Sequence, residues 1–253
     1  MQMSRREFLT ATAAGMAMAT IPTSFAGEQR PKGLCRAIAF DALVVFDLRP
    51  VFALAEEMFP GRGGELNALW KARQFEYMWL RTLSGRYADF PSTTRDALVF
   101  AAKSLKIDLQ PDQNERLLDS YFHLKAWPDV IPALQQLRGA GIKLGFLSNF
   151  SEAMLPTNIK SAGLGGYFDQ LLSTDRVKAF KPDRRAYQMG IDAFGVKREE
   201  IVFAAFAGWD AAGAKSFGYP TFWVNRQNAA EEELAAHPDA TGSLSDLAKF
   251  ANV

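Results

Sequence analysis

The sequence predicts an α/β protein with a Rossmann-like, mostly parallel sheet and a helical cap inserted after its first strand. Short apolar runs alternate with helical segments from residue 128 to residue 224, a pattern typical of parallel strands joined by right-handed crossovers. Between the first apolar run and this region, residues 52–121 have helical spacing of their apolar side chains. We therefore expect a core domain over residues 27–49 and 128–253, with a helical cap domain over residues 50–127.

Each expected core strand is short, apolar and bounded by polar or turn residues, as buried parallel strands are. The first covers residues 37–40, and the later ones cover residues 142–147, 170–173, 201–205 and 221–224. Helices are expected between them at residues 130–137, 152–162, 185–194 and 211–217, with a weak final helix at 244–250. Gly139 and Gly141 mark the end of the first of these helices.

The expected cap consists of helices only. Residues 52–83 carry leucines and aromatic side chains at helical spacing. Residues 91–94 look like a turn and helix start, with Ser92 or Thr93 as the cap of a helix through Lys103. A further helix is expected over residues 109–121, where Pro111 and Asp112 mark the first turn.

Composition limits the partners and cofactors. The chain has 253 residues, of which 48% are hydrophobic and 23% charged, enough for a sizeable core and a smaller module. The net charge of +1 gives no field that would attract nucleic acid or an acidic membrane, so a small-molecule substrate is expected. Cys35 is the single cysteine, which excludes an internal disulfide and a cysteine-built metal cluster. We expect no cofactor and no metal.

The first 26 residues have the features of an export signal. Ser4-Arg5-Arg6-Glu7-Phe8-Leu9 resembles a twin-arginine motif, residues 10–20 are weakly apolar, and Ser24-Phe25-Ala26 is a candidate cleavage site. The apolar stretch is too short to span a bilayer as a mature helix. A frayed N-terminal helix is the alternative. The signal predicts a periplasmic protein that starts near Gly27 and has no membrane attachment afterwards.

Four polar clusters follow the expected strands and carry the chemistry. They are Asp41, the pair Ser148-Asn149, Lys181 and Asp210. Because an open α/β sheet gathers its reactive groups at the carboxyl ends of its strands, we expect these side chains to form one site. A carboxylate nucleophile with a nearby cation to keep it ionised is suited to covalent hydrolysis through an ester.

Each of these residues also has a plain structural interpretation. Asp41 could be a turn aspartate at a strand end, and Asp210 could cap the helix that follows it. Ser148-Asn149 could cap a helix near Ser151, and Lys181 could be a solvated loop lysine. The aromatic residues of the cap could serve only for packing; they are Trp70, Tyr77, Trp79 and Phe90.

Over most of its mature length the chain resembles the type II L-2-haloacid dehalogenases of the haloacid dehalogenase superfamily. Five separated motifs occur in the family's order: Phe40-Asp41; the cap residues 59–63, 69–70 and 74–77; 147–149; 181–183; and 209–214. The resemblance implies that Asp41 displaces halide from a short 2-haloalkanoic acid. Water then cleaves the aspartyl ester, which gives a 2-hydroxy acid of inverted configuration. The resemblance also suggests a homodimer.

The resemblance also implies residue roles. Lys181 steadies Asp41, and Asp210 orients the lysine or the hydrolytic water. Ser148 binds the substrate carboxylate and Asn149 the departing halide. The remaining substrate-binding positions are Lys71, Tyr187, Phe90 and Leu43.

The chain departs from the family pattern at three places. The family's glycine and threonine after the nucleophile are missing from Ala42-Leu43-Val44-Val45-Phe46, so a hydroxyl donor is lost and Asp47 arrives one residue early. Lys71 replaces an arginine and lacks its planar fork. Arg73 lies roughly 200° further round a helix and cannot simply replace it. Before Trp209, polar residues are replaced by Phe206-Ala207-Gly208, which removes hydrogen bonds that would help place Lys181 or water.

Two other functions remain as alternatives. A phosphatase of the same superfamily normally needs a second aspartate two residues after the nucleophile, where this chain has Leu43. It also needs another acid near Asp210, and residues 209–213 supply only one carboxylate for Mg²⁺. The second alternative is a catalytically drifted periplasmic binding protein that kept only the scaffold.

Overall fold

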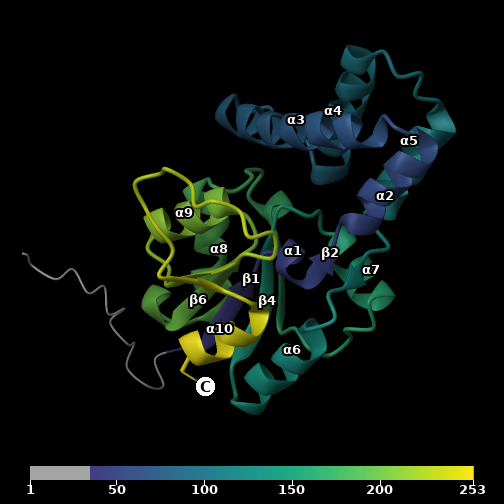
Figure 1. Cartoon of the computed structure of the whole chain (residues 1–253). Helices are drawn as coiled ribbons and strands as arrows, with labels where there is room; N and C mark the ends of the chain where they lie inside the picture. The colour runs from purple at the N-terminus through teal and green to yellow at the C-terminus, as the bar shows by residue number, and fades with distance from the viewer. Residues whose placement is uncertain (1–34, 253) are drawn as a thin grey trace, which may run out of the picture.

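A computed structural model describes residues 35–252, so the expected export signal and the start near Gly27 lie outside the described residues (Figure 1). The core is a parallel sheet with the strand order β5-β4-β1-β6-β7-β8. Its strands are β1 (Ala37–Phe40), β4 (Lys143–Ser148), β5 (Gln170–Ser173), β6 (Ile201–Ala205), β7 (Thr221–Val224) and β8 (Ala240–Gly242). The predicted α/β class with a mostly parallel sheet is confirmed.

Alternating side chains along the strands divide the core into two layers. On β1, Ile38 and Phe40 belong to one hydrophobic cluster, while Ala37 and Ala39 belong to the other. The first cluster packs against α6 (Val130–Gly139), α7 (Met154–Ser161) and α10 (Leu244–Phe250), and the second against α8 (Arg184–Phe194) and α9 (Gly208–Phe217). Helices on both faces explain why the strands are apolar throughout.

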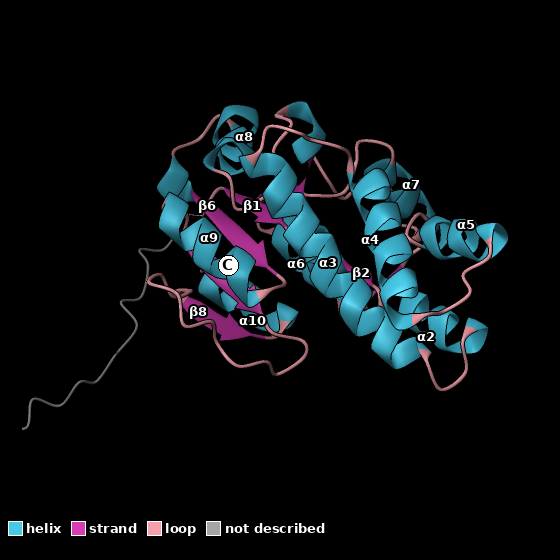
Figure 2. Cartoon of the chain, turned by 90° about the horizontal axis from the view of Figure 1, so that it is seen from above, coloured by secondary structure: helices cyan, strands magenta, loops and turns pink. Residues whose placement is uncertain are grey.

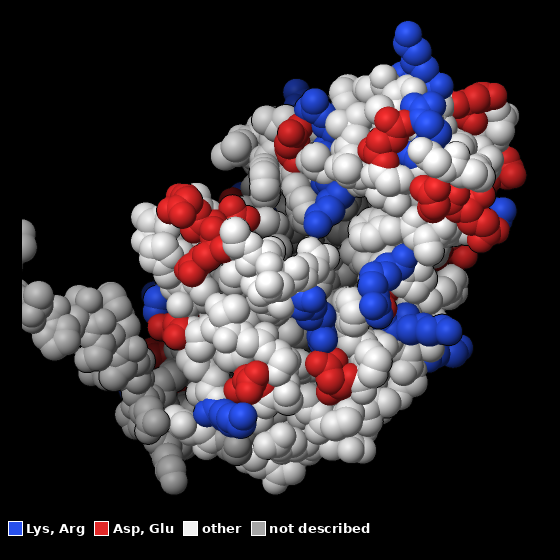
Figure 3. All heavy atoms as spheres, viewed as in Figure 1, with Lys and Arg blue, Asp and Glu red and all other residues white. Residues whose placement is uncertain are grey.

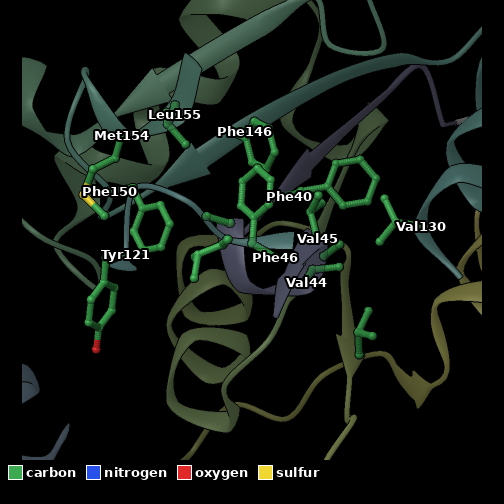
Figure 4. Close-up of a cluster of buried hydrophobic side chains, with 14 of the residues drawn as sticks. Phe40, Val44, Val45, Phe46, Tyr121, Val130, Phe146, Phe150, Met154 and Leu155 are labelled. Carbon is green, nitrogen blue, oxygen red and sulfur yellow. The ribbon is translucent and has the colours of Figure 1, made fainter. Parts of the chain in front are cut away.

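The first layer continues beneath the segment that follows β1. There the chain forms a short helix, α1 (Ala42–Val45), and then β2 (Phe46–Asp47), which pairs antiparallel with β3 (Lys125–Ala126). The ring of Phe46 stacks on Phe146 of β4, with ring centroids 5.4 Å apart (Figure 4). Packing against the sheet therefore fixes the backbone directly after Asp41.

The helical cap consists of α2 (Arg49–Met58), α3 (Gly63–Leu83), α4 (Phe90–Leu105) and α5 (Pro111–Ser120). The helical pattern of residues 52–83 is divided by a break at residues 59–62 that the sequence analysis did not predict. Gly61 has φ +74°, and its amide donates to the Glu56 carboxylate at 2.6 Å. Gly63 approaches α2 so closely that a Cβ there would lie 2.3 Å from Glu56 Cα. The break folds α3 back over α2.

Several smaller elements differ from the sequence predictions. The strand β8 and the pair β2–β3 were not predicted, and they are only two or three residues long. Asp89, rather than Ser92 or Thr93, caps α4 and accepts from the Ser92 amide at 2.9 Å. The helix expected from residue 152 begins at Met154. The chain also forms two short 3₁₀ helices, Thr174–Arg176 and Arg198–Glu200.

The cap lies over the carboxyl edge of the sheet, with α3 crossing above it (Figure 2). Hydrogen bonds tie this helix and the loop after it to the core. The Phe180 amide donates to Thr82 Oγ1 at 3.0 Å, and the Tyr87 hydroxyl donates to the Asp175 carboxylate. Among residues 35–252, no helix is both long and apolar enough to cross a bilayer.

Candidate active site

A cavity of about 450 Å³ separates the cap from the carboxyl edge of the sheet. Core residues at its floor include Asp41, Ser148, Asn149 and Asp210. Figure 3 shows this side of the molecule, where the space between cap and core is hollowed and carries lysine and arginine side chains at its rim. The strand-end clusters predicted from the sequence therefore meet at one hollow.

Asp41 lies directly after β1 and is the N-cap of α1. Its Oδ1 accepts from the Leu43 amide at 2.9 Å, and its Oδ2 accepts from Lys181 Nζ at 2.7 Å. The Asp41 amide donates to the Ala204 carbonyl of β6 at 2.9 Å, which extends the sheet to this residue. Asp41 is thus the turn aspartate of the plain interpretation, and it also lines the cavity.

Lys181 is completely buried, which rules out the solvated-loop interpretation. Its Nζ donates to Asp41 Oδ2 at 2.7 Å and to Asp210 Oδ2 at 2.5 Å. Its amide donates to Asn149 Oδ1 at 2.9 Å. Burial alone would lower the pKa of Lys181, but Asp210 and Asp41 outweigh it and raise that pKa above its usual value. Lys181 therefore carries a positive charge between two carboxylates.

Asp210 lies in the first turn of α9, whose N-cap is Ala207, so the alternative interpretation of Asp210 as the cap of this helix does not hold. Its side chain is buried and accepts from the Tyr187 hydroxyl through Oδ1 at 2.7 Å. Burial raises the pKa of Asp210 to about 6, although Lys181 beside it acts in the opposite direction. Burial, with Asp210 nearby, also raises the pKa of Tyr187 well above its usual value, so the phenol is the donor.

Ser148 and Asn149 follow β4 and line the cavity beside Asp41. Ser148 Oγ accepts from the Phe150 amide at 3.1 Å, so the hydroxyl holds a tight turn. Asn149 uses its Oδ1 for the Lys181 amide, while its Nδ2 lies 3.7 Å from Met78 Sδ of the cap. Because α7 starts only at Met154, neither residue caps that helix.

The remaining predicted binding residues divide into two groups. Lys71, Phe90 and Leu43 line the cavity. Tyr187 does not, because it is fully buried behind Asp210; the expectation that it lines the site was wrong. The aromatic contacts of α8 and α9 hold its ring there, and only its hydroxyl reaches the site through Asp210.

Arg73 and the apolar residues before Trp209 lie as the sequence departures suggest, but Lys181 keeps its partners. Arg73 is directed away from the cavity, where it pairs with Glu76 and lies over the Phe100 ring at 4.7 Å. Phe206 and Ala207 do line the cavity. Lys181 is nevertheless held by Asp41 and Asp210, so the apolar residues before Trp209 do not leave it without partners.

The cavity also contains residues that the sequence analysis did not identify. Arg49, Trp127 and Arg226 line its side next to Leu43, and Gln74 and Tyr121 line it beneath α3. Asp47, two residues earlier, was an available signal for Arg49. The two side chains form a bidentate ion pair in which Arg49 Nε donates to Asp47 Oδ1 at 3.0 Å and Nη2 donates to Oδ2 at 2.7 Å. Trp127 and Arg226 gave no local signal.

The arrangement suits covalent hydrolysis. One carboxylate, Asp41, faces the cavity and is held by an ammonium group and an amide. A second, Asp210, lies behind the same ammonium with a pKa close to neutrality, as a general base requires. Among residues 35–252, no group of three or more His, Cys, Asp and Glu side chains is arranged to hold a metal ion.

Comparisons with known proteins agree with this geometry. The family model described as haloacid dehalogenase-like hydrolase matches residues 51–218. An (S)-2-haloacid dehalogenase of Pseudomonas putida is 38% identical over 218 residues, which cover 86% of this chain and 95% of that protein. The corresponding enzyme of Pseudomonas sp. (strain YL) is 42% identical over 205 residues, which cover 81% and 88%.

Solved structures give the same result. The L-2-haloacid dehalogenase RSc1362 is similar with a TM-score of 0.84 and 40% identity, covering 87% of this chain and 99% of that one. The L-2-haloacid dehalogenase from Xanthobacter autotrophicus with chloropropionic acid covalently bound has a TM-score of 0.79 and 32% identity. That match covers 85% of this chain and 98% of the Xanthobacter chain.

The buried ion triad predicts a specific stability pattern. Lys181→Met leaves Asp41 and Asp210 without their ammonium, and we expect it to lower the free energy of unfolding by about 3–5 kcal/mol at neutral pH. Adding Asp210→Asn should recover part of this loss, because one of the two unpaired carboxylates is removed. Lys71→Met, which removes an exposed lysine of the same cavity, should change stability by less than about 0.5 kcal/mol. Urea unfolding of the four proteins checks the pattern, and equal stability of Lys181→Met and Lys71→Met would contradict it.

Proposed function

The chain belongs to the haloacid dehalogenase-like hydrolase family, and from this premise we propose that it hydrolyses the carbon–halogen bond of short (S)-2-haloalkanoic acids to 2-hydroxy acids and halide. One observation carries the proposal: Lys181 Nζ joins Asp41 to Asp210 at the floor of the cavity. An ionised carboxylate facing a mostly apolar cavity is a suitable nucleophile for an alkyl carbon.

In the first step, an Asp41 carboxylate oxygen attacks the halogen-bearing carbon from the side opposite the halogen. The C–O bond forms as the carbon–halogen bond breaks, and the halide leaves with the bonding electron pair. Attack from the rear inverts the configuration at this carbon. The leaving halide needs no proton. The reaction therefore requires no acid two residues after the nucleophile, where this chain has Leu43.

In the second step, water attacks the carbonyl carbon of the Asp41 ester. Once Asp41 is esterified it no longer carries a charge, so Asp210 becomes the sole carboxylate partner of Lys181 within the triad. Asp210 takes the proton of the water. Its pKa is about 6 while Asp41 is ionised, and loss of the Asp41 charge in the ester lowers that pKa, so Asp210 is ionised at neutral pH. The bond between the carbonyl carbon and the product oxygen then breaks, and Asp210 returns its proton to that oxygen. The 2-hydroxy acid leaves, the second water proton passes to solvent, and the Asp41 carboxylate is restored.

The cavity provides partners for the two ends of the substrate. We assign the substrate carboxylate to Ser148 and to the Lys71 ammonium, which lines the opposite, cap side. The departing halide is assigned to Asn149 Nδ2, which among residues 35–252 has Met78 Sδ at 3.7 Å as its one hydrogen-bond partner. Phe90 forms part of the apolar wall next to Phe150.

Two alternatives have less support. A phosphatase would need an acid at Leu43 and a further carboxylate near Asp210, whereas Leu43, Phe206 and Ala207 line the cavity there. A HAD phosphatase from Thermococcus onnurineus is a structural neighbour with a TM-score of 0.59 and 25% identity. A drifted binding protein would not require a buried ammonium shared by two carboxylates, whose burial is costly.

We also propose that the protein is exported by the twin-arginine pathway to the periplasm and acts as a homodimer. The support for export is the order of residues 4–26, with arginines, an apolar stretch and a small-residue exit. Cell fractionation with and without residues 1–26 would test it. The support for a dimer is the family resemblance, together with Leu80 and Leu83 exposed on α3. Light scattering would test it.

The proposed nucleophile leads to a direct test. Asp41→Asn should abolish halide release from (S)-2-chloropropionate, because the amide is a poor nucleophile. In the wild-type protein, intact mass spectrometry after rapid quenching should detect an ester on Asp41. Phosphate release from p-nitrophenyl phosphate with Mg²⁺ would instead support the phosphatase. If the wild-type protein shows neither activity, the alternative of a binding protein is favoured.

The pKa of Asp210 predicts the acid limb of the pH profile. Since the Asp41 charge contributes to the Asp210 pKa of about 6 and is absent from the ester, the acid limb of ester hydrolysis should lie below pH 6. There Asp210 is protonated and cannot accept the water proton, so hydrolysis should slow and the Asp41 ester should accumulate. The Tyr187 hydrogen bond lowers the pKa of Asp210; Tyr187→Phe should therefore move the acid limb to higher pH. Tyr219→Phe, whose hydroxyl donates to the Tyr187 carbonyl at 2.6 Å and not to Asp210, is the matched control. An acid limb that moves equally in both variants would contradict this role of Asp210.

A further inference from the structure

The short helix after the nucleophile ends in carbonyl groups that other parts of the chain satisfy. The last four carbonyls of any helix lack partners within it. In α1 and its C-cap these belong to residues 43–46. Trp127 Nε1 donates to the carbonyls of Leu43 and Phe46 at 3.2 and 3.1 Å. The Trp127 amide donates to Val45 at 3.0 Å, and Arg226 Nη2 donates to Val44 at 2.8 Å. Two residues therefore hold all four carbonyls.

The donors themselves are held in place. The Trp127 ring has the Arg49 guanidinium 4.5 Å from its centroid and the Arg226 guanidinium 4.7 Å from it. Arg226 has a side chain only 11% exposed and pairs with Asp129 at 3.0 Å. Arg49 is anchored by Asp47, and stacked cations of this kind stabilise an aromatic ring. The indole is thus fixed in position and orientation.

Fixing these carbonyls determines where the Asp41 carboxylate points. The helix α1 has only four residues, too few to be stable without external contacts. Its first turn supplies the Leu43 amide that binds Asp41 Oδ1 at 2.9 Å. Lys181 binds only the other oxygen, Oδ2. If residues 43–46 could move, Asp41 would keep its charge partner but lose the donor that sets its rotation.

We propose that Trp127 and Arg226 are positioning residues for the nucleophile: they clamp the carbonyls of residues 43–46 and thereby aim the Asp41 carboxylate at the substrate carbon. The proposal rests on the proposed dehalogenase function for its kinetic consequence. Neither residue takes part in bond making. A displacement of about 1 Å at a reacting group can cost roughly 100-fold in rate. Because Asp41 is the attacking group in ester formation, loss of the clamp should slow that step.

The test compares the wild-type chain with Trp127→Phe, which keeps an aromatic ring but removes the Nε1 donor. At saturating (S)-2-chloropropionate, we expect the single-turnover rate of halide release to fall at least about tenfold, with KM changed by less than about threefold. Arg226→Lys, which keeps a charged donor, should retain more of this rate than Arg226→Met. The Arg226 pair keeps the test informative if Trp127→Phe folds poorly.

Trp70→Phe is the matched control for the loss of a buried indole hydrogen bond. Trp70 Nε1 donates to the Thr94 carbonyl at 2.8 Å within the cap, away from residues 43–46. It should lower the melting temperature without slowing halide release. The proposal is overturned if Trp127→Phe lowers the melting temperature as Trp70→Phe does and leaves the single-turnover rate unchanged. It is also overturned if only KM changes, since Trp127 would then be a substrate contact.

A second measurement separates this proposal from the dehalogenase function. Hydrogen exchange of the peptide that contains the Leu43 and Val44 amides requires no substrate. Faster exchange in Trp127→Phe and Arg226→Met, but not in Trp70→Phe, supports the clamp even if the wild-type protein releases no halide. Unchanged exchange in both variants overturns the clamp, whatever the activity.

Discussion

The site depends on the buried ammonium group of Lys181. Removing an ammonium and two carboxylates from water costs several kcal/mol per ion, and close contacts must offset this cost. The contacts of 2.7 and 2.5 Å to Asp41 and Asp210 do so, and they keep Lys181 charged despite complete burial. Because Asp41 follows β1, Asp210 starts α9 and Lys181 precedes α8, the ion triad joins three separate segments. The same contacts that hold these segments together position Asp41, the proposed nucleophile, and Asp210, the proposed base.

The sheet order explains how the triad and its neighbours meet. β1 lies between β4 and β6, so the residue after it has the end of β4 on one side and that of β6 on the other. Ser148 and Asn149 therefore stand beside Asp41 on the β4 side, and Asp210 stands on the β6 side. The Asn149 side chain then connects the two groups, because it accepts from the Lys181 amide at 2.9 Å. The proposed substrate-binding pair Ser148-Asn149 is thus connected to the ion triad through the Asn149 side chain.

The parts predicted from the sequence were those with local signals. Five of the strands are apolar runs with clear ends: β1, β4, β5, β6 and β7. Because they pair in parallel, their carboxyl ends lie at the same edge of the sheet, and the polar residues that follow them converge there. The break before Gly63 was missed although Pro60-Gly61 is a local turn signal, because the aromatic and leucine spacing on both sides of it reads as one helix. Its geometry is set by Glu56, which accepts from the Gly61 and Gly64 amides. Tyr187 was misplaced for a similar reason. Its motif position indicated proximity to the site, but only packing against Phe217 and Phe203 decides that Asp210 lies between it and the cavity.

The segment after Asp41 shows why departures from a family pattern are hard to interpret from sequence. The missing glycine and threonine suggested a loss of hydrogen bonds to the nucleophile, yet the Leu43 amide and Lys181 Nζ each donate to one oxygen of Asp41. The contacts that hold the segment itself come from Trp127 and Arg226, 84 and 182 residues from the carbonyls of Leu43 and Val44 that they bind. Only the folded chain brings the return strand from the cap and the end of β7 to this segment. A stiff apolar turn, held from outside by an indole and a guanidinium, can thus position Asp41 where a flexible turn would need its own hydroxyl.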